Sequence, residues 1–182
     1  MAVGPDVFVS DGAETAVAVD IANGNLLATV FNKGYSNSLS SLRVSANGGL
    51  SWANRTFPNG TGTFTDYPYD PWAAAGNAGG ELFASLIRRD TDSPLARVVI
   101  ARSHDGGGVW SRFFEATTND WHDRAMFDLD RSAARGGGSG GAHDGSIYLT
   151  YDGFDASDNY VASYFQEVSP TGVLTRDWTI ST

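Results

Sequence analysis

The sequence has 182 residues and a formal net charge of −9, from 21 acidic and 12 basic residues. A surface this acidic repels phosphate backbones and anionic lipid headgroups, which excludes nucleic acid and membrane surfaces as partners. The absence of cysteine excludes disulfides and thiolate metal sites, and no apolar run is long enough for membrane insertion. With 41% hydrophobic residues and 22 glycines, the composition predicts a folded all-β chain of short strands.

The predicted strands form three successive units of similar length. Short alternating or apolar runs are separated by Asn-Gly and Gly-Gly pairs, which are strong hairpin signals. This order predicts four-stranded antiparallel blades of a β-propeller, about three in this chain, as a partial propeller or half of a six-bladed ring. The expected strands are 15–19, 26–31 and 41–44 in the first unit; 72–75, 81–87, 97–102 and 112–115 in the second; and 125–129, 146–151, 160–165 and 177–180 in the third. We place blade 1 at about 11–60, blade 2 at about 66–118 and blade 3 at about 121–182, with 5–10 as the outer strand of a neighbouring blade.

A repeated turn of the form Ser-x-(Asp/Asn)-Gly-Gly-x-x-Trp marks the first two units, at 45–52 and 103–110. The Asp or Asn side chain bonds backbone N–H groups in such a turn, and the glycines supply positive φ at low cost. A looser third copy at 169–175 keeps the Ser and one Gly and precedes Trp178. The residues read as structural elements of these turns are Ser45, Asn47, Gly48, Trp52, Ser103, Asp105, Gly106 and Trp110.

This repeat resembles the Asp-box, or bacterial neuraminidase repeat, of sialidase-like propellers, and the resemblance in blade order extends over nearly the whole chain. It implies that the turns are structural and lie away from any catalytic centre. The family includes exo-sialidases, other glycoside hydrolases and extracellular binding proteins. A sialidase of the family also carries an Arg-Ile-Pro motif, which does not occur in this sequence.

Three carboxylates, one in each unit, are the main candidates for function. Glu14, Asp70 and Asp123 each stand just before the expected innermost strand, so the repeat places them near one mouth of the central channel. Carboxylates beside aromatic rings suit sugars, because hydroxyls donate to carboxylates and apolar sugar faces stack on rings. The alternative is that they only cap strand ends and bond turn amides. The other candidate binding residues are Tyr67, Trp72, Trp121 and His122.

No cofactor is expected from the sequence, although hard cations favour oxygen ligands and a calcium ion at these carboxylates stays an alternative. The acidic segment 152–159 does not match an EF-hand loop and reads as a solvated hairpin. The three histidines have no metal-ligand spacing, so no metal site is predicted from them.

The leading interpretation is an extracellular or cell-surface propeller module that binds a glycan or a protein, although the chain shows no signal peptide. A part of a sialidase-like glycoside hydrolase is the first alternative, and a structural self-assembling subunit is the second. Three blades are too few to close a propeller. The expected partner is therefore a second copy of the chain or the remainder of a longer propeller.

Overall fold

The computed structural model describes residues 14–31, 42–58, 64–90, 96–116, 121–131 and 143–182. Of these it describes the backbone alone at 64–68, 89–90 and 121. The proposed outer strand at 5–10 lies outside the described residues. Among the residues described, no helix has the length and apolar character needed to cross a membrane.

In the described part of the chain, twelve strands form three separate four-stranded sheets, and in each sheet the strands lie in chain order. All pairings are antiparallel. The prediction of three four-stranded antiparallel blades is therefore confirmed. Blade 1 has β1 (Thr15–Val19), β2 (Leu27–Phe31), β3 (Leu42–Ser45) and β4 (Ala53–Arg55); blade 2 has β5 (Phe64–Ala75), β6 (Leu82–Asp90), β7 (Ala96–Ser103) and β8 (Ser111–Glu115); blade 3 has β9 (Trp121–Leu129), β10 (Ile147–Phe154), β11 (Tyr160–Val168) and β12 (Leu174–Ser181).

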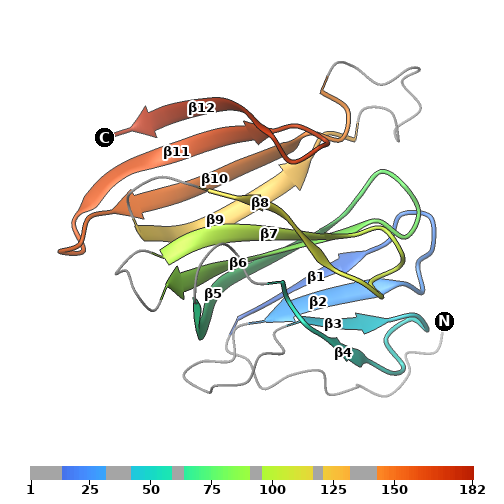
Figure 1. Cartoon of the computed structure of the whole chain (residues 1–182). Coiled ribbons are helices and arrows are strands. Elements are labelled where there is room, and N and C mark those ends of the chain that lie inside the picture. Colours follow the sequence, from blue (N-terminus) through green and yellow to red (C-terminus); the bar gives the residue numbers. More distant parts are fainter. Residues whose placement is uncertain (1–13, 32–41, 59–63, 91–95, 117–120, 132–142) are drawn as a thin grey trace.

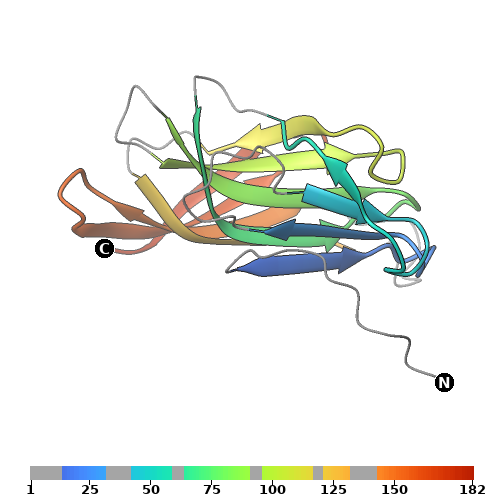
Figure 2. The same cartoon turned by 90° about the horizontal axis from the view of Figure 1, so that it is seen from below.

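The three blades pack face to face, with blade 2 between the other two (Figure 1). Figure 2 shows how β1 to β4 follow one another across blade 1. The first strands β1, β5 and β9 lie beside one another, as the inner strands of a propeller do. Their N-terminal ends lie at one end of the molecule, and the β3–β4, β7–β8 and β11–β12 hairpins lie at the other (Figure 1).

The hydrophobic core consists of layers between the blades, because each strand alternates its side chains between two faces. Between blades 2 and 3, one cluster joins Ile100 and Phe114 to Phe127 and Leu129. Two further clusters fill the layer between blades 1 and 2, with Trp110 packed against both. Blade 2 is therefore covered on both faces, whereas blades 1 and 3 each have one face covered by another described blade.

The three hairpin turns, here called the Ser-Gly turns (45–52, 103–110 and 169–173), share one hydrogen-bond pattern. Ser103 Oγ accepts the N–H groups of Asp105 and Gly107, and Ser45 and Ser169 accept the equivalent pairs in their own turns. Thr171 holds the Asp position of the third turn, with its hydroxyl 2.9 Å from Ser169 Oγ. Trp52 and Trp110 donate their indole N–H to Gly49 and Gly107. Trp178 does not close the third turn but packs against Phe165 in the sheet, with the two rings tilted.

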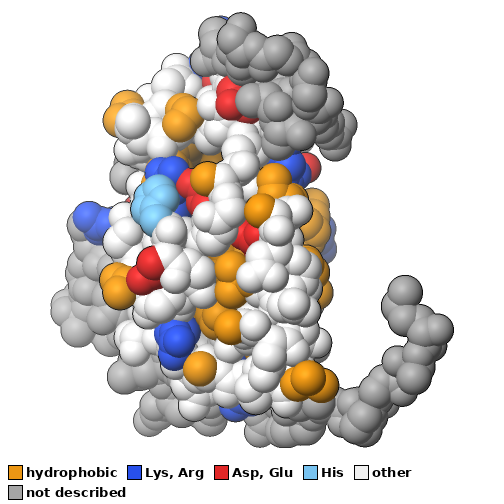
Figure 3. All heavy atoms as spheres, turned by 90° about the vertical axis from the view of Figure 1, so that its right-hand side faces the viewer, with side chains coloured by type: hydrophobic (Ala, Val, Ile, Leu, Met, Phe, Trp, Pro, Cys, Tyr) orange, Lys and Arg blue, Asp and Glu red, His pale blue; other side chains and the backbone are white. Residues whose placement is uncertain are grey.

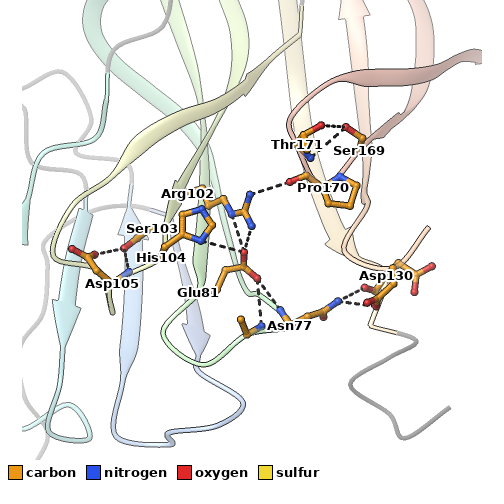
Figure 4. A network of polar contacts seen from close by, with 12 residues as sticks. Asn77, Glu81, Arg102, Ser103, His104, Asp105, Asp130, Ser169, Pro170 and Thr171 are labelled. Atoms are coloured by element: carbon orange, nitrogen blue, oxygen red, sulfur yellow. Dashed lines mark hydrogen bonds and ion pairs between the residues drawn. The ribbon is translucent and has the colours of Figure 1, made fainter. Parts of the chain in front are cut away.

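The end of the molecule that carries these turns holds mixed charges. Figure 3 shows acidic, basic and histidine side chains there, between small groups of hydrophobic ones. Glu81 is buried at this end and binds the Arg102 guanidinium and the N–H of Asn77, 3.0 Å away (Figure 4). Arg102 also donates to the carbonyl of Pro170 in the third turn. This network therefore ties blade 2 to blade 3 through polar contacts as well as through the core.

Candidate functional site

The pairing registers define which residues of the three inner strands are equivalent. Val19, Ala75 and Leu129 each pair with the first residue of the next strand. Counting back five residues from each places Glu14, Asp70 and Arg124 at equivalent positions. Asp123 lies one residue before this position. The sequence-based trio is therefore corrected at its third member, where the equivalent residue is an arginine with the predicted aspartate beside it.

A β-bulge at this position explains why the sequence pattern does not show that Asp70 and Arg124 are equivalent. Asp70 and Pro71 face the single residue Leu86, and Arg124 and Ala125 face the single residue Tyr151. Asp70 and Arg124 have φ values of 44° and 53°. A bulged residue with positive φ bends the strand and redirects its side chain. β5 and β9 consequently begin at Phe64 and Trp121, upstream of the expected starts at 72 and 125.

Hydrogen bonds across the blade boundaries connect these positions in series. A Glu14 carboxylate oxygen accepts the Asp70 N–H at 3.3 Å, and an Asp70 oxygen accepts the Arg124 N–H at 2.5 Å. The same contact is thus repeated from blade 1 to blade 2 and from blade 2 to blade 3. These caps hold the carboxylates at one end of the inner strands, on the opposite end of the sheets from the Ser-Gly turns.

The Asp70 carboxyl is half-buried, and its pKa is higher than that of an ordinary aspartate. Burial, a side-chain hydrogen bond with Asp123 and the charges of Asp123 and Glu14 raise its pKa to about 6, against the lowering effect of the Arg124 N–H. Burial disfavours the charged form of the carboxyl most, and the contact with Asp123 acts in the same direction. The Asp70 carboxyl is therefore partly protonated in mildly acidic solution.

Blade 3 contributes further polar groups that the sequence analysis did not single out. Asp152 pairs with Asp123 in the sheet and lies 3.9 Å from the exposed Arg124 guanidinium. Its other oxygen accepts a bond from Ser163 Oγ at 2.5 Å, and the Tyr160 hydroxyl lies 2.8 Å from the same Ser163 oxygen. Asp152 was read as part of a solvated hairpin, because strand alternation does not reveal cross-strand partners. The acidic mouth is hereafter Glu14, Asp70, Asp123, Arg124 and Asp152.

The predicted aromatic platform is only partly described. Trp72 is 38% exposed and lies two residues after Asp70 in β5, and Tyr69, directly before Asp70, is 36% exposed. The backbones of Tyr67 and Trp121 lie in β5 and β9 on the strand segments upstream of the bulges, and their side chains lie outside the described part. An exposed tryptophan therefore lies close in sequence to the mouth.

His122 is not on the open surface. It is 1% exposed, its ring lies 4.4 Å from that of Tyr151, and its Nδ1 accepts the Val98 N–H from blade 2 at 3.2 Å. Burial and the nearby Arg97 charge lower its pKa to about 3, so the ring is neutral. The structure thus gives His122 a packing position between blades 2 and 3.

Among the described residues, no three His, Cys, Asp or Glu side chains are arranged to hold a metal ion. The carboxylates of the mouth instead bind backbone N–H groups, a hydroxyl and each other.

Comparison with known proteins extends the description of the fold. No family model matches the sequence, and no curated protein is significantly similar to it. The structure is similar to that of an α-L-arabinofuranosidase from Fusarium graminearum, solved in complex with an iminosugar inhibitor. The TM-score is 0.63 at 10% sequence identity, and the match covers 91% of this chain and 47% of that chain. The chain therefore has the fold of a partial β-propeller and spans about half the length of that enzyme.

Proposed function

We propose that the chain is a carbohydrate-binding propeller module whose ligand occupies the acidic mouth. The observation that carries this proposal is the series of hydrogen bonds Glu14–Asp70–Arg124, which brings side chains of three blades to one end of the inner strands. The caps hold these groups in place before a ligand arrives, which lowers the entropic cost of binding. The likeness to a glycoside hydrolase propeller supports a sugar as the ligand by analogy of fold.

The chemistry of the mouth favours a neutral sugar. Carboxylates accept hydrogen bonds from hydroxyls strongly, and the exposed Trp72 ring offers an apolar face for a pyranose or furanose ring. The mouth combines four carboxyl groups with one arginine among its named members, in a chain with a net charge of −9. This charge repels an anionic sugar such as sialic acid. Sialidase-like kinship, which the Ser-Gly turns suggest, therefore applies to the scaffold in this proposal and not to the ligand.

The contact between Asp70 and Asp123 argues against these two carboxyls as a catalytic pair. Glycosidases hold their two catalytic carboxyls about 5 to 9.5 Å apart, so that a glycosidic bond fits between them. Asp70 and Asp123 are directly hydrogen-bonded to each other, which is too close for that arrangement.

The module is proposed to act outside the cell or at its surface, on an oligosaccharide or on the glycan of a glycoprotein.

Hydrolysis is the second candidate, favoured by the acidity of Asp70. A carboxyl with a pKa near 6 is partly protonated around neutral pH, as a general acid requires. In that case Asp70 would protonate the leaving oxygen, and a carboxylate other than Asp123 would act as its partner. The chain would then form part of a glycoside hydrolase.

A glycan array tests the proposal with two matched variants. Asp70→Asn alters the mouth, whereas Asp158→Asn alters an exposed loop aspartate that also has a positive φ of 64°. Asparagine tolerates positive φ at both positions. We expect the native protein and Asp158→Asn to bind the same neutral glycans, including some ending in α-L-arabinofuranose, and Asp70→Asn to lose that signal. Hydrolysis of chromogenic glycosides by the native protein but not by Asp70→Asn would support the second candidate instead, and an unchanged array signal for Asp70→Asn would exclude the mouth.

A further inference from the structure

The outer face of blade 1 has the same pattern of apolar residues as the buried faces of the chain. Val17 and Val19 in β1 are equivalent to Phe127 and Leu129 in β9, by the registers that align the inner strands. Phe127 and Leu129 are 3% and 5% exposed because blade 2 covers them. Val17 and Val19 are 58% and 47% exposed. The outer face of blade 1 therefore exposes positions equivalent to those at which blade 3 packs against blade 2, and no described blade covers it.

The outer face of blade 3 has the complementary pattern. Phe165 pairs with Trp178 in the same register in which Ile100 pairs with Phe114. The pair Ile100–Phe114 forms the layer that receives blade 3. Trp178 is 42% exposed, and Ile180, two residues further along β12, is 60% exposed. The free face of blade 3 is therefore the counterpart of the blade 2 face that already binds a blade.

Contacts between aromatic rings order the free face of blade 3 before any partner binds to it. Tyr148 stacks on Phe165 at 5.9 Å, and Phe165 lies 5.2 Å from Trp178. A row of aromatic rings that crosses three strands is rigid and large, which is typical of the centre of an interface. Exposure of such a row in a chain without further partners would favour aggregation.

Arginines lie at both internal blade boundaries and also on the free face of blade 3. At the internal boundary, Arg102 lies over Phe83 and Phe113, pairs with Glu81 and donates to the turn carbonyl of Pro170 in the next blade. Arg55 in blade 1 likewise donates to the turn carbonyl of Gly107. On the free face of blade 3, Arg176 lies over Trp178 and is 3.5 Å from Glu167. Arg176 is therefore a partly exposed cation beside Trp178 on this face.

We infer that these two faces bind each other between two copies of the chain. Blade 3 of each copy packs on blade 1 of the other, and the two identical junctions close a ring with two-fold symmetry. The number of copies in the ring is set by the number of blades, because propellers close with about four to eight blades. The described residues of one copy supply three blades, so two copies supply six, and three copies exceed that range. Each junction repeats the interface that the chain already forms twice within itself.

The first test is the mass of the purified chain in solution, measured by light scattering after gel filtration. We expect twice the chain mass of 19.3 kDa. The variants Val17→Glu and Trp178→Glu each place a charge on one face, and Val109→Glu places it on an exposed turn residue away from both faces. We expect monomers for the first two variants and a dimer for the third, with native circular dichroism in all of them.

Mixing the two monomeric variants distinguishes this ring from other dimers. A Val17→Glu copy retains its blade 3 face and a Trp178→Glu copy retains its blade 1 face, so one intact junction forms and dimers reappear at higher concentration. A dimer through two blade 1 faces would survive Trp178→Glu, which overturns the proposal. A folded native monomer also overturns it and leaves the two faces to blades other than those of a second copy. Should a charge variant fail to fold, Val17→Ser and Ile180→Ser, which remove apolar area alone, are expected to weaken the dimer at least tenfold.

Discussion

A carboxylate oxygen of Asp70 accepts a hydrogen bond from the backbone N–H of Arg124, across the boundary between blades 2 and 3. Both residues sit at the first position of a β-bulge with positive φ. The bulge in β5 turns the Asp70 side chain toward blade 3. Its hydrogen bond with the Arg124 N–H then holds the first residue of the equivalent bulge in β9. One position therefore joins the blades and holds the carboxyls of the mouth, so its titration reports on both stability and binding.

The free energy of unfolding should depend on pH through Asp70. Its pKa is raised in the folded state to about 6 from 3.8, so the folded state holds the extra proton between these values. Stability contributed by this group is greatest below pH 4 and falls as pH rises to 6. We expect Asp70→Asn to be more stable than the native protein by about 1 kcal/mol at pH 7, after allowance for solvent screening of a half-exposed group.

Urea unfolding of the native protein and Asp70→Asn at pH 4 and pH 7 measures this effect. At pH 4 the two free energies should agree within error, and Asp158→Asn should match the native protein at both values. A stability gain that is equal at both pH values would show that ionisation of Asp70 is not its cause.

His122 should give stability the opposite dependence on pH. Its pKa is lowered in the folded state to about 3 from 6.5. Between these two values the unfolded chain binds a proton at His122 and the folded chain does not. Stability is complete above pH 6.5 and falls as pH decreases toward 3, by about 2 kcal/mol at pH 5. His122→Asn, which keeps an acceptor near the Val98 N–H, should lose this slope while being less stable at pH 7.

The comparison of His122→Asn with the native protein requires thermal or urea unfolding at several pH values from 5 to 8. His104→Asn makes the same change at an exposed ring, 3.7 Å from the Glu81 carboxylate, and should keep the slope that His122 causes. If the native protein and His122→Asn have parallel stability curves, the neutral buried state of His122 is incorrect.

Gly107 should not tolerate a side chain. A Cβ at this residue would lie 2.6 Å from a methyl group of Val44 in blade 1, and its φ is +84°. Alanine therefore combines backbone strain of about 1–2 kcal/mol with overpacking of about 1–3 kcal/mol. We expect Gly107→Ala to lower the free energy of unfolding by at least about 2 kcal/mol, whereas Gly24→Ala, with open space around it, should change it by less than about 1 kcal/mol. Equal losses in the two variants would contradict close packing of the turn against blade 1.

The pair Glu81–Arg102 should show strong energetic coupling. Arg102→Met leaves the buried Glu81 carboxylate without its cation, which costs on the order of 3 kcal/mol. In the double variant with Glu81→Gln the residue at 81 is neutral and still accepts the Asn77 N–H, so part of the loss is recovered. A double-mutant cycle by urea unfolding should give a coupling of about 1–3 kcal/mol, and additive losses would rule out the interaction as a source of stability.

The repeated hairpins could be predicted from sequence because their information is local. A serine, a small polar residue and glycines at fixed spacing determine the turn, and the turn then fixes the order of the strands around it. Even Thr171, which departs from the pattern, fits the same geometry, because a hydroxyl can also bond the turn serine. Three four-stranded blades followed directly from these turns.

The candidate site was less accessible, because its geometry depends on contacts between distant strands. Pro71 and a positive φ at Asp70 interrupt the alternation of β5, so the strand seemed to start after the bulge. That shift made Asp123 look equivalent to Asp70 when Arg124 is. The sequence places His122 among aromatic residues next to Asp123 and so predicts a binding role, whereas its burial arises only when blade 2 packs on blade 3.

Backbone amide chemical shifts in a titration with an oligosaccharide ending in α-L-arabinofuranose test the central claim most directly. The N–H groups of Asp70 and Arg124 are bonded to the carboxylates proposed to hold the sugar, so their signals should move in proportion to saturation. The signals of Gly48 and Gly106 in the Ser-Gly turns, at the opposite end of the sheets, should stay unchanged. Shifts confined to the Ser-Gly turns, or shifts at Asp70 and Arg124 that persist unchanged in Asp70→Asn, would contradict carbohydrate binding at the acidic mouth.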